Sequence, residues 1–154
     1  MLSDPAVRRH FGEGTSLMAA TADGEGVPMC CRAVGLAQAA DGIVRVYLPV
    51  ATAAPMVANL ATTRLIAVVS SFPVDHVTIQ LKGRSRAVRI AREDERPAVA
   101  GWLNKFADVV GSLGLPHAVT LGLAHWPAFA VEMEVDAIFD QTPGPRAGAM
   151  VRKR

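Results

Sequence analysis

The chain has few aromatic residues and no long apolar run. Aromatic residues make up 5% of its 154 residues, whereas hydrophobic residues make up 51%. No uninterrupted apolar stretch reaches the roughly 18–20 residues that a membrane-spanning helix needs. The N-terminal segment MLSDPAVRRHF also lacks the apolar centre of a secretory signal peptide. We therefore expect one cytoplasmic domain, long enough to bury a core and without a membrane partner.

Cysteine is scarce, and the common catalytic and nucleotide-binding motifs are missing. The two cysteines, Cys30 and Cys31, are neighbours, and the geometry of a disulfide strains so short a ring. There is no CxxC pair and the histidines are scattered, so no metal site is predicted. A P-loop, a dinucleotide-binding GxGxxG loop and a Ser-His-Asp arrangement are also missing from the sequence. These absences leave any catalytic residue unassigned.

The charge balance gives little reason to expect a nucleic acid partner. Lys and Arg total 16 against 14 Asp and Glu, a formal net charge of +2. Lys82, Arg84 and Arg86 share one face of an expected strand, and residues 132–136 offer acidic side chains at matching spacing. Cross-strand charge pairing is favoured for Arg84 and Arg86, although an anion-binding groove is the alternative. Sheets that bind RNA usually interleave aromatics with cations, and none do so here.

Alternating apolar residues and turn signals predict six antiparallel strands. They cover residues 16–21, 27–36, 43–48, 65–69, 77–90 and 128–140. The continuous apolar run at 65–69 predicts a strand buried on both faces. Gly83 lies where the apolar parity of the long strand shifts, which predicts a bulge and a bend.

Helical spacing predicts three main helical segments outside the sheet. A short helix is expected at residues 6–11, a second at 53–61 and a third running from Asp94 toward residue 113. Thr52 would cap the second helix after a loop at 49–52. The plan is mainly β (α+β): a six-stranded barrel with flanking helices, formed by a single domain at residues 1–142. Residues 143–154 are expected to form an extended C-terminal tail.

Three short motifs, in this order, resemble the pyridoxamine 5'-phosphate oxidase-like, FMN-binding split-barrel family. Residues 32–36 (RAVGL) resemble its R-x-V-x-L strand, and residues 46–49 (VYLP) stand where its third strand ends. Residues 78–83 (TIQLKG) resemble its [TR]-x-Q-[VIL]-x-G strand. The order of the elements matches over residues 5–142. The resemblance implies an antiparallel split barrel that forms a homodimer, binds FMN at the interface and oxidises or reduces a small molecule.

The resemblance also assigns residues to the cofactor. Arg32 would hold the FMN phosphate or the ring edge, because a guanidinium offers a bidentate fork for phosphate. Gln80 would hydrogen-bond the polar edge of the flavin, with Lys82 on the same face. Further cofactor contacts would come from Ala33, Val34, Pro49, Val50, Thr52 and Arg146.

One departure from the family pattern opens a second interpretation. The family usually places Ser, Arg or Lys after the third strand, whereas residues 49–55 (PVATAAP) contain no cation. The Thr52 hydroxyl and the amides that open the next helix are the phosphate ligands that remain. The alternative function is therefore a split-barrel binding protein that has no cofactor or an altered ligand.

Overall fold

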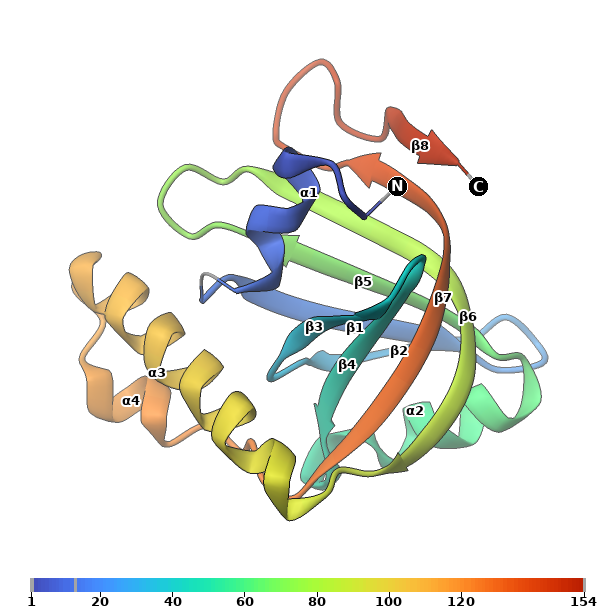
Figure 1. The fold of residues 1–154 in the computed structure, drawn as a ribbon, viewed down its shortest axis with the longest axis horizontal. Coiled ribbons are helices and arrows are strands. Elements are labelled where there is room, and N and C mark those ends of the chain that lie inside the picture. Colours follow the sequence, from blue (N-terminus) through green and yellow to red (C-terminus); the bar gives the residue numbers. More distant parts are fainter. Residues whose placement is uncertain (1, 13, 154) are drawn as a thin grey trace.

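The computed structural model describes residues 2–12 and 14–153, which form a β-barrel with helices on its outside (Figure 1). Seven strands follow one another in the hydrogen-bonded order β2-β1-β5-β6-β7-β4-β3, and β8 pairs with β7. Every strand pairing is antiparallel. None of the described helices is long and apolar enough to cross a membrane. The mainly antiparallel barrel predicted from the sequence is confirmed.

The strands match the predicted ones closely, with two differences. They are β1 (Ser16–Ala22), β2 (Pro28–Arg32), β3 (Leu36–Ala40), β4 (Ile43–Pro49), β5 (Leu65–Ser71), β6 (Thr78–Ile90), β7 (Ala128–Asp140) and β8 (Met150–Lys153). The strand expected at 27–36 ends at Arg32 as β2, and β3, which was not predicted, begins at Leu36, the last residue of the expected range. In addition, the C-terminal segment contributes β8, and Arg152 reaches Asp4 in an ion pair of 3.4 Å near the N-terminus.

The segment between β2 and β3 closes the barrel. Ala33 N donates to the Leu17 carbonyl of β1 at 3.0 Å. One residue later Val34 N donates to the Tyr47 carbonyl of β4 at 2.8 Å, and Tyr47 N donates to the Gly35 carbonyl. The chain therefore changes its strand partner at residues 33–35 and joins the two edges of the sheet. An apolar alternation pattern carries no information about which strand is the partner, so the sequence predicted a single strand here.

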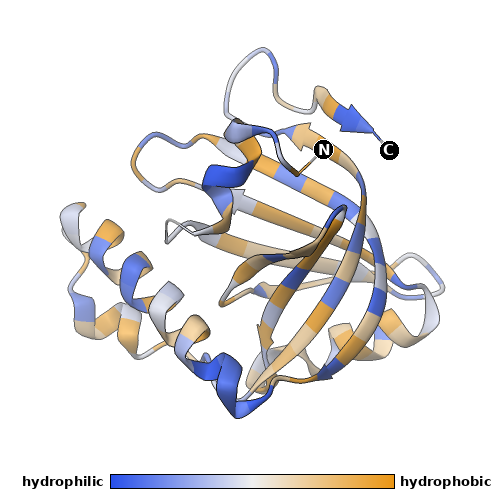
Figure 2. Cartoon of the chain, in the orientation of Figure 1, coloured by the Kyte–Doolittle hydropathy of each residue, from blue (hydrophilic) through white to orange (hydrophobic). Residues whose placement is uncertain are grey.

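Side chains alternate between the barrel interior and its outer surface. Ala19, Val68, Leu81 and Ile138 lie side by side on four neighbouring strands and are fully buried. Figure 2 shows the resulting stripes of apolar and polar residues along the strands. Strand β5 follows the same alternation, so the prediction that residues 65–69 are buried on both faces is wrong. Its outward residues are small or apolar, which made the run look continuous.

The helices lie at the side and the end of the barrel (Figure 1). They are α1 (Pro5–Arg8), η1 (Arg9–Phe11), α2 (Val50–Thr62), η2 (Glu93–Glu95), α3 (Arg96–Ser112) and α4 (His117–Leu121). Helix α2 starts directly after β4, with Pro49 as its N-cap residue. The predicted loop at 49–52 and the capping role of Thr52 are therefore wrong, because Thr52 is the third residue of the helix.

Strand β6 is long and bent, as Gly83 predicted. The register against β7 shifts between Lys82 and Gly83 and again between Ser85 and Ala87. The backbone of β7 crosses so close to Gly83 that a Cβ atom there would collide with the carbonyl of Glu134. Only glycine allows the two strands to approach in this way.

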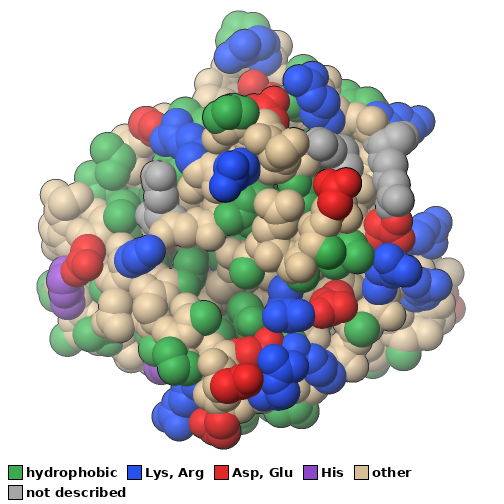
Figure 3. All heavy atoms as spheres, viewed as in Figure 1, with side chains coloured by type: hydrophobic (Ala, Val, Ile, Leu, Met, Phe, Trp, Pro, Cys, Tyr) green, Lys and Arg blue, Asp and Glu red, His purple; other side chains and the backbone are tan. Residues whose placement is uncertain are grey.

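A buried carboxylate connects the end of β6 to the barrel. Arg89 donates to both oxygens of Glu95 at 2.6 and 2.8 Å, and Arg92 N donates at 2.8 Å. Tyr47 donates its hydroxyl at 3.1 Å, and Arg45 lies 3.3 Å away. The hydrogen bonds from Arg89 are the main reason that the pKa of Glu95 falls to about 2. Charged side chains of both signs gather on the surface at the lower end of Figure 3, where β6 leads into α3.

We predict that Gly83→Ala destabilises the protein by about 1–3 kcal/mol, because the added methyl group meets backbone and not a movable side chain. Gly101→Ala is the matched control. Gly101 lies inside α3 with open space around it, so the same change is expected to stabilise by about 0.5–1 kcal/mol. Urea unfolding of both variants measures the two effects. Equal effects of the two substitutions would contradict the close crossing at Gly83.

We predict that Glu95→Gln destabilises the protein by about 2–4 kcal/mol at neutral pH, since it leaves the Arg89 guanidinium without its carboxylate, whereas Arg45 keeps Glu132. The pKa of Glu95 is lowered from 4.5 to about 2, so its stabilising effect is complete above pH 4.5 and is lost as the pH falls toward 2. The unfolding free energy of the variant should therefore fall less steeply than that of the unmodified protein as the pH decreases through that range. Unfolding free energies measured between pH 7 and pH 2.5 test this.

Two comparisons make the Glu95 measurement specific. Glu93→Gln removes an exposed carboxylate and is expected to change stability by less than about 0.5 kcal/mol. His10 supplies a separate acid effect, because burial lowers its pKa from 6.5 to about 4. Its contribution is complete above pH 6.5 and is lost as the pH falls toward 4. An acid limb of Glu95→Gln that matches the unmodified protein below pH 4 would refute the role of Glu95.

Candidate functional site

Several of the residues predicted to bind the cofactor line one hollow beside the point of barrel closure. The hollow has a volume of about 300 Å³. Its lining includes Arg32 at the end of β2, together with Pro49 and Thr52 at the start of α2. The other lining residues are Cys30, Cys31, Leu123 and Ala124. The fold thus brings together two motifs that lie 17 residues apart in the sequence.

One nitrogen of the Arg32 guanidinium, Nη1, is available to donate a hydrogen bond to a ligand. Its Nη1 is enclosed by protein and has no hydrogen-bond partner among residues 2–12 and 14–153. Its Cζ lies 5.5 Å from the centre of the Phe106 ring of α3, which holds one side of the group. A cationic N–H removed from water without an acceptor is costly, whereas an anion at this position would satisfy it.

The first turn of α2 adds further donors to the hollow. The helix is 13 residues long and has no side-chain hydrogen bond at its N-cap. Val50 N donates to the Pro127 carbonyl at 2.9 Å, and the amides that follow begin the helix. Free N–H groups and the helix dipole make such a position favourable for a phosphate group. Thr52 adds a hydroxyl, and burial raises the pKa of the neighbouring Cys31 thiol, which keeps it neutral.

Ala33 and Val34 cannot contribute side chains to this hollow, because both are fully buried. Their amides are also engaged, in the two hydrogen bonds that close the barrel. Any contribution of these two residues to a bound cofactor is therefore indirect. They fix the backbone from which Arg32 projects.

A lateral row of residues connects Arg32 to Gln80 across the outside of the barrel. Arg32 pairs with Met18, Met18 with Val69, and Val69 with Gln80. Directly paired residues of neighbouring strands project from the same face of a sheet. Three strand spacings of about 4.8 Å separate the ends of the row, roughly 14 Å in total. The two residues singled out by the sequence motifs thus lie on one surface, at opposite ends of a mostly apolar strip.

The Gln80 side chain is half-buried and oriented by a neighbour. Its Oε1 accepts a hydrogen bond from Gln141 Nε2 at 3.2 Å. Gln141 comes directly after β7, so two strand ends hold this carboxamide in place. A fixed carboxamide on a surface is suited to reading the hydrogen-bonding edge of a flat ligand.

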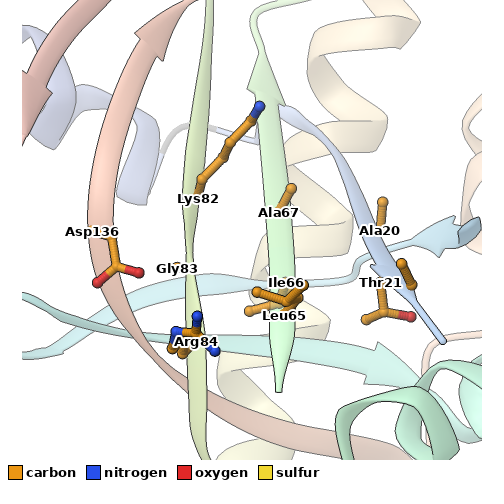
Figure 4. A pocket seen from close by; sticks show the side chains of 10 residues that line it. Ala20, Thr21, Leu65, Ile66, Ala67, Lys82, Gly83, Arg84 and Asp136 are labelled. Carbon is orange, nitrogen blue, oxygen red and sulfur yellow. The ribbon is translucent and has the colours of Figure 1, made fainter. Parts of the chain in front are cut away.

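Lys82 is exposed two residues further along β6, on the same face as Gln80. Its Nζ lies 4.8 Å from the centre of the Phe139 ring, and Phe139 pairs with Gln80. Lys82 also lines a second hollow, with Arg84 and Asp136, which is shown in Figure 4. Sequence reasoning missed this hollow, because the charges at 84 and 136 were expected to pair with neighbours.

Arg146 lies apart from the other predicted contacts. Its side chain is 85% exposed, and its Nε lies 3.8 Å from a carboxylate oxygen of Asp140. The structure therefore groups Arg32, Pro49 and Thr52 in one hollow, and joins that hollow to Gln80 through the lateral row. A contact between Arg146 and a ligand stays a prediction.

No family model matches the chain, and no curated protein matches it. Solved structures do. An F420 reductase has a TM-score of 0.55 at 12% identity, with 85% of this chain and 94% of that chain covered. An FMN-binding protein from Syntrophomonas wolfei has a TM-score of 0.52 at 11% identity, with 80% and 75% covered. A candidate pyridoxamine 5'-phosphate oxidase from Lactobacillus delbrueckii has a TM-score of 0.50 at 13% identity, with 80% and 83% covered.

These similarities confirm the fold that the sequence motifs predicted, although identities of 11–13% carry no residue assignments. The chain therefore has the split-barrel fold of the pyridoxamine 5'-phosphate oxidase-like proteins.

Proposed function

We propose that this protein binds FMN on the outer face of its barrel, between two copies of the chain, and serves as an oxidoreductase for a small molecule. One observation carries the proposal: Nη1 of Arg32 is enclosed, with no hydrogen-bond partner in the described part of the chain, beside the start of α2, which lacks a side-chain cap. The residues present fit the cofactor. A phosphate would occupy the hollow, and the lateral row leads from there to the Gln80 carboxamide.

Each group has a distinct part in holding the cofactor. Arg32, the Thr52 hydroxyl and the first amides of α2 would bind the phosphate. Met18 and Val69 give the ring an apolar surface, and Gln80 offers hydrogen bonds to its polar edge. FMN, when bound, supplies hydride or electron transfer. The chain itself orients the ring and excludes water, and no catalytic side chain is assigned.

A second copy of the chain would complete the site. The lateral row is a surface, and Met18 and Leu65 on the same face are 38% and 44% exposed. A flat ring bound to one barrel alone would keep much of its area in water, whereas ligand sites usually bury most of the ligand. The exposed apolar strip is also what a homodimer interface needs at its centre.

The alternative function is a binding protein of the same fold with no cofactor or an altered ligand. One feature favours it: Arg32 is the single cation among the described residues that line the hollow. A phosphate dianion held by one guanidinium, a hydroxyl and helix amides is bound less tightly than one held by several cations. A smaller monoanion would satisfy the same groups.

We predict that the purified protein is yellow or takes up FMN at micromolar concentrations, seen by its visible absorbance and by quenching of flavin fluorescence. Arg32→Met should weaken FMN binding by about 10- to 100-fold, the usual effect of losing a charge-assisted hydrogen bond. If Arg32 holds the phosphate, the same substitution should leave riboflavin binding unchanged. If it holds the ring edge, both ligands should weaken alike.

The matched control for this experiment is Arg86→Met. Arg86 is exposed, pairs with Glu134 at 3.9 Å and does not line the hollow, so its removal should not alter FMN affinity. Colourless protein that shows no binding at tens of micromolar FMN would contradict the proposal. It would favour the binding protein without FMN.

We predict a dimer in sedimentation velocity experiments, and a shift toward monomer in Met18→Glu. The substitution places a charge at the centre of the proposed interface, where desolvating it is unfavourable. Leu113→Glu is the control, because Leu113 is 56% exposed at the end of α3 and away from the lateral row. The proposal fails if the unmodified chain stays monomeric at every concentration tested.

A further inference from the structure

One unexplained feature of the outer face is the second hollow, whose volume is about 380 Å³ (Figure 4). It spans strands β1, β5, β6 and β7, and the described residues that line it include Ala20, Ala67 and Leu65. Ala20 and Ala67 are paired on adjacent strands, and their small side chains leave a depression that larger side chains would fill. Its volume lies within the range of small-molecule sites, which are mainly apolar with a few polar groups.

Three charged side chains border this hollow: Lys82 and Arg84 from β6, and Asp136 from β7. In the sheet Lys82 lies opposite Ala137, whereas Arg84 lies opposite Glu134, and Arg86, two residues further on, lies 3.9 Å from the same Glu134. Two cations against one carboxylate leave the border of the hollow with a net charge of +1. Glu134 is thus shared between Arg84 and Arg86, and Lys82 has a neutral residue opposite it, so positive charge remains at the border for a ligand.

The hollow adjoins the end of the lateral row at which Gln80 lies. Lys82 follows Gln80 by two residues on the same face, about 7 Å along the strand. Its ammonium leans back over the Phe139 ring, next to Gln80 in the sheet. A molecule in the hollow would therefore border whatever occupies the surface at Gln80.

We propose that this hollow binds a planar, singly charged carboxylate, as the substrate of the FMN site. This assignment of substrate class rests on the proposed function, whereas the binding site itself does not. The apolar floor takes the flat body of the ligand, and Lys82 and Arg84 take its carboxylate. The carboxylate of Asp136 repels a second negative charge on the ligand, so a monoanion is preferred over a phosphate dianion.

The test uses three probes of similar shape and different charge: benzoate, neutral benzamide and dianionic phenylphosphate. Each is titrated into the full-length protein, with and without saturating FMN, and amide shifts are followed by NMR. Benzoate should shift amides of β1, β5 and β6 around the hollow and should bind more tightly than the other two. Benzoate at tens of millimolar that shifts none of these amides would overturn the proposal.

Four variants separate charge from shape. Arg84→Met should weaken benzoate binding by about tenfold and leave benzamide unaffected. Arg86→Met removes the same charge from the same strand outside the hollow and should change neither. Asp136→Asn should raise the affinity for phenylphosphate more than that for benzoate. Ala67→Phe fills the floor and should abolish binding of all three probes, while its spectrum reports whether the fold is kept.

The outcomes distinguish this proposal from the cofactor proposal. If FMN does not bind but benzoate binding still depends on Arg84, the anion site stands and the FMN function fails. If FMN binds and benzoate does not, the proposed substrate site is wrong and the FMN function stands. If Arg84→Met and Arg86→Met weaken benzoate equally, binding reflects general surface charge and the site is refuted.

Discussion

The change of strand partner at residues 33–35 is the constraint on which the rest of the structure depends. The amide of Ala33 still bonds to β1, whereas that of Val34 already bonds to β4. A sheet that curls into a barrel has two edges to satisfy, and this segment satisfies both with one stretch of chain. Because Arg32 is the last residue before the change, closure also fixes its guanidinium beside the start of α2.

Closure leaves the outside of the sheet as the surface on which we propose that a ligand binds. The interior is filled by residues such as Ala19, Val68 and Leu81, so no ligand can enter it. Their sequence neighbours Met18, Val69 and Gln80 must face outward, because successive side chains alternate along a strand. The same pleat that packs the core therefore aligns the lateral row. A surface of this kind binds a flat molecule well only when something else covers it, which is the physical argument for a second copy.

Features that depend on the local residue pattern were predicted from the sequence, whereas features that depend on which strands pair with each other were not. The bounds of β7 and the bulge at Gly83 followed from alternation and from a glycine at a change of parity. The division of the strand at 27–36 did not, because it depends on which strand lies alongside. Similarly, Arg32 and Gln80 were identified by motif, but the row that joins them depends on the pairing of β1 with β5, a contact distant in the chain. The early start of α2 removed the expected cap at Thr52 and placed that residue in the hollow instead.

The cationic side chains of β6 differ in their surroundings: some pair with acidic residues of the protein, and others border a hollow that a ligand could occupy. Arg89 is fixed by Glu95, and Arg86 lies close to Glu134, so both serve the end of the strand where it leads into α3. Before the second register shift, Lys82 and Arg84 border the second hollow together with Asp136. The extra β7 residue at the Gly83 bulge is Asp136 itself, and beyond it Arg84 pairs in register with Glu134, which also lies 3.9 Å from Arg86. A strand that looks uniformly basic in sequence thus has its positive charge divided between acidic neighbours and an open hollow.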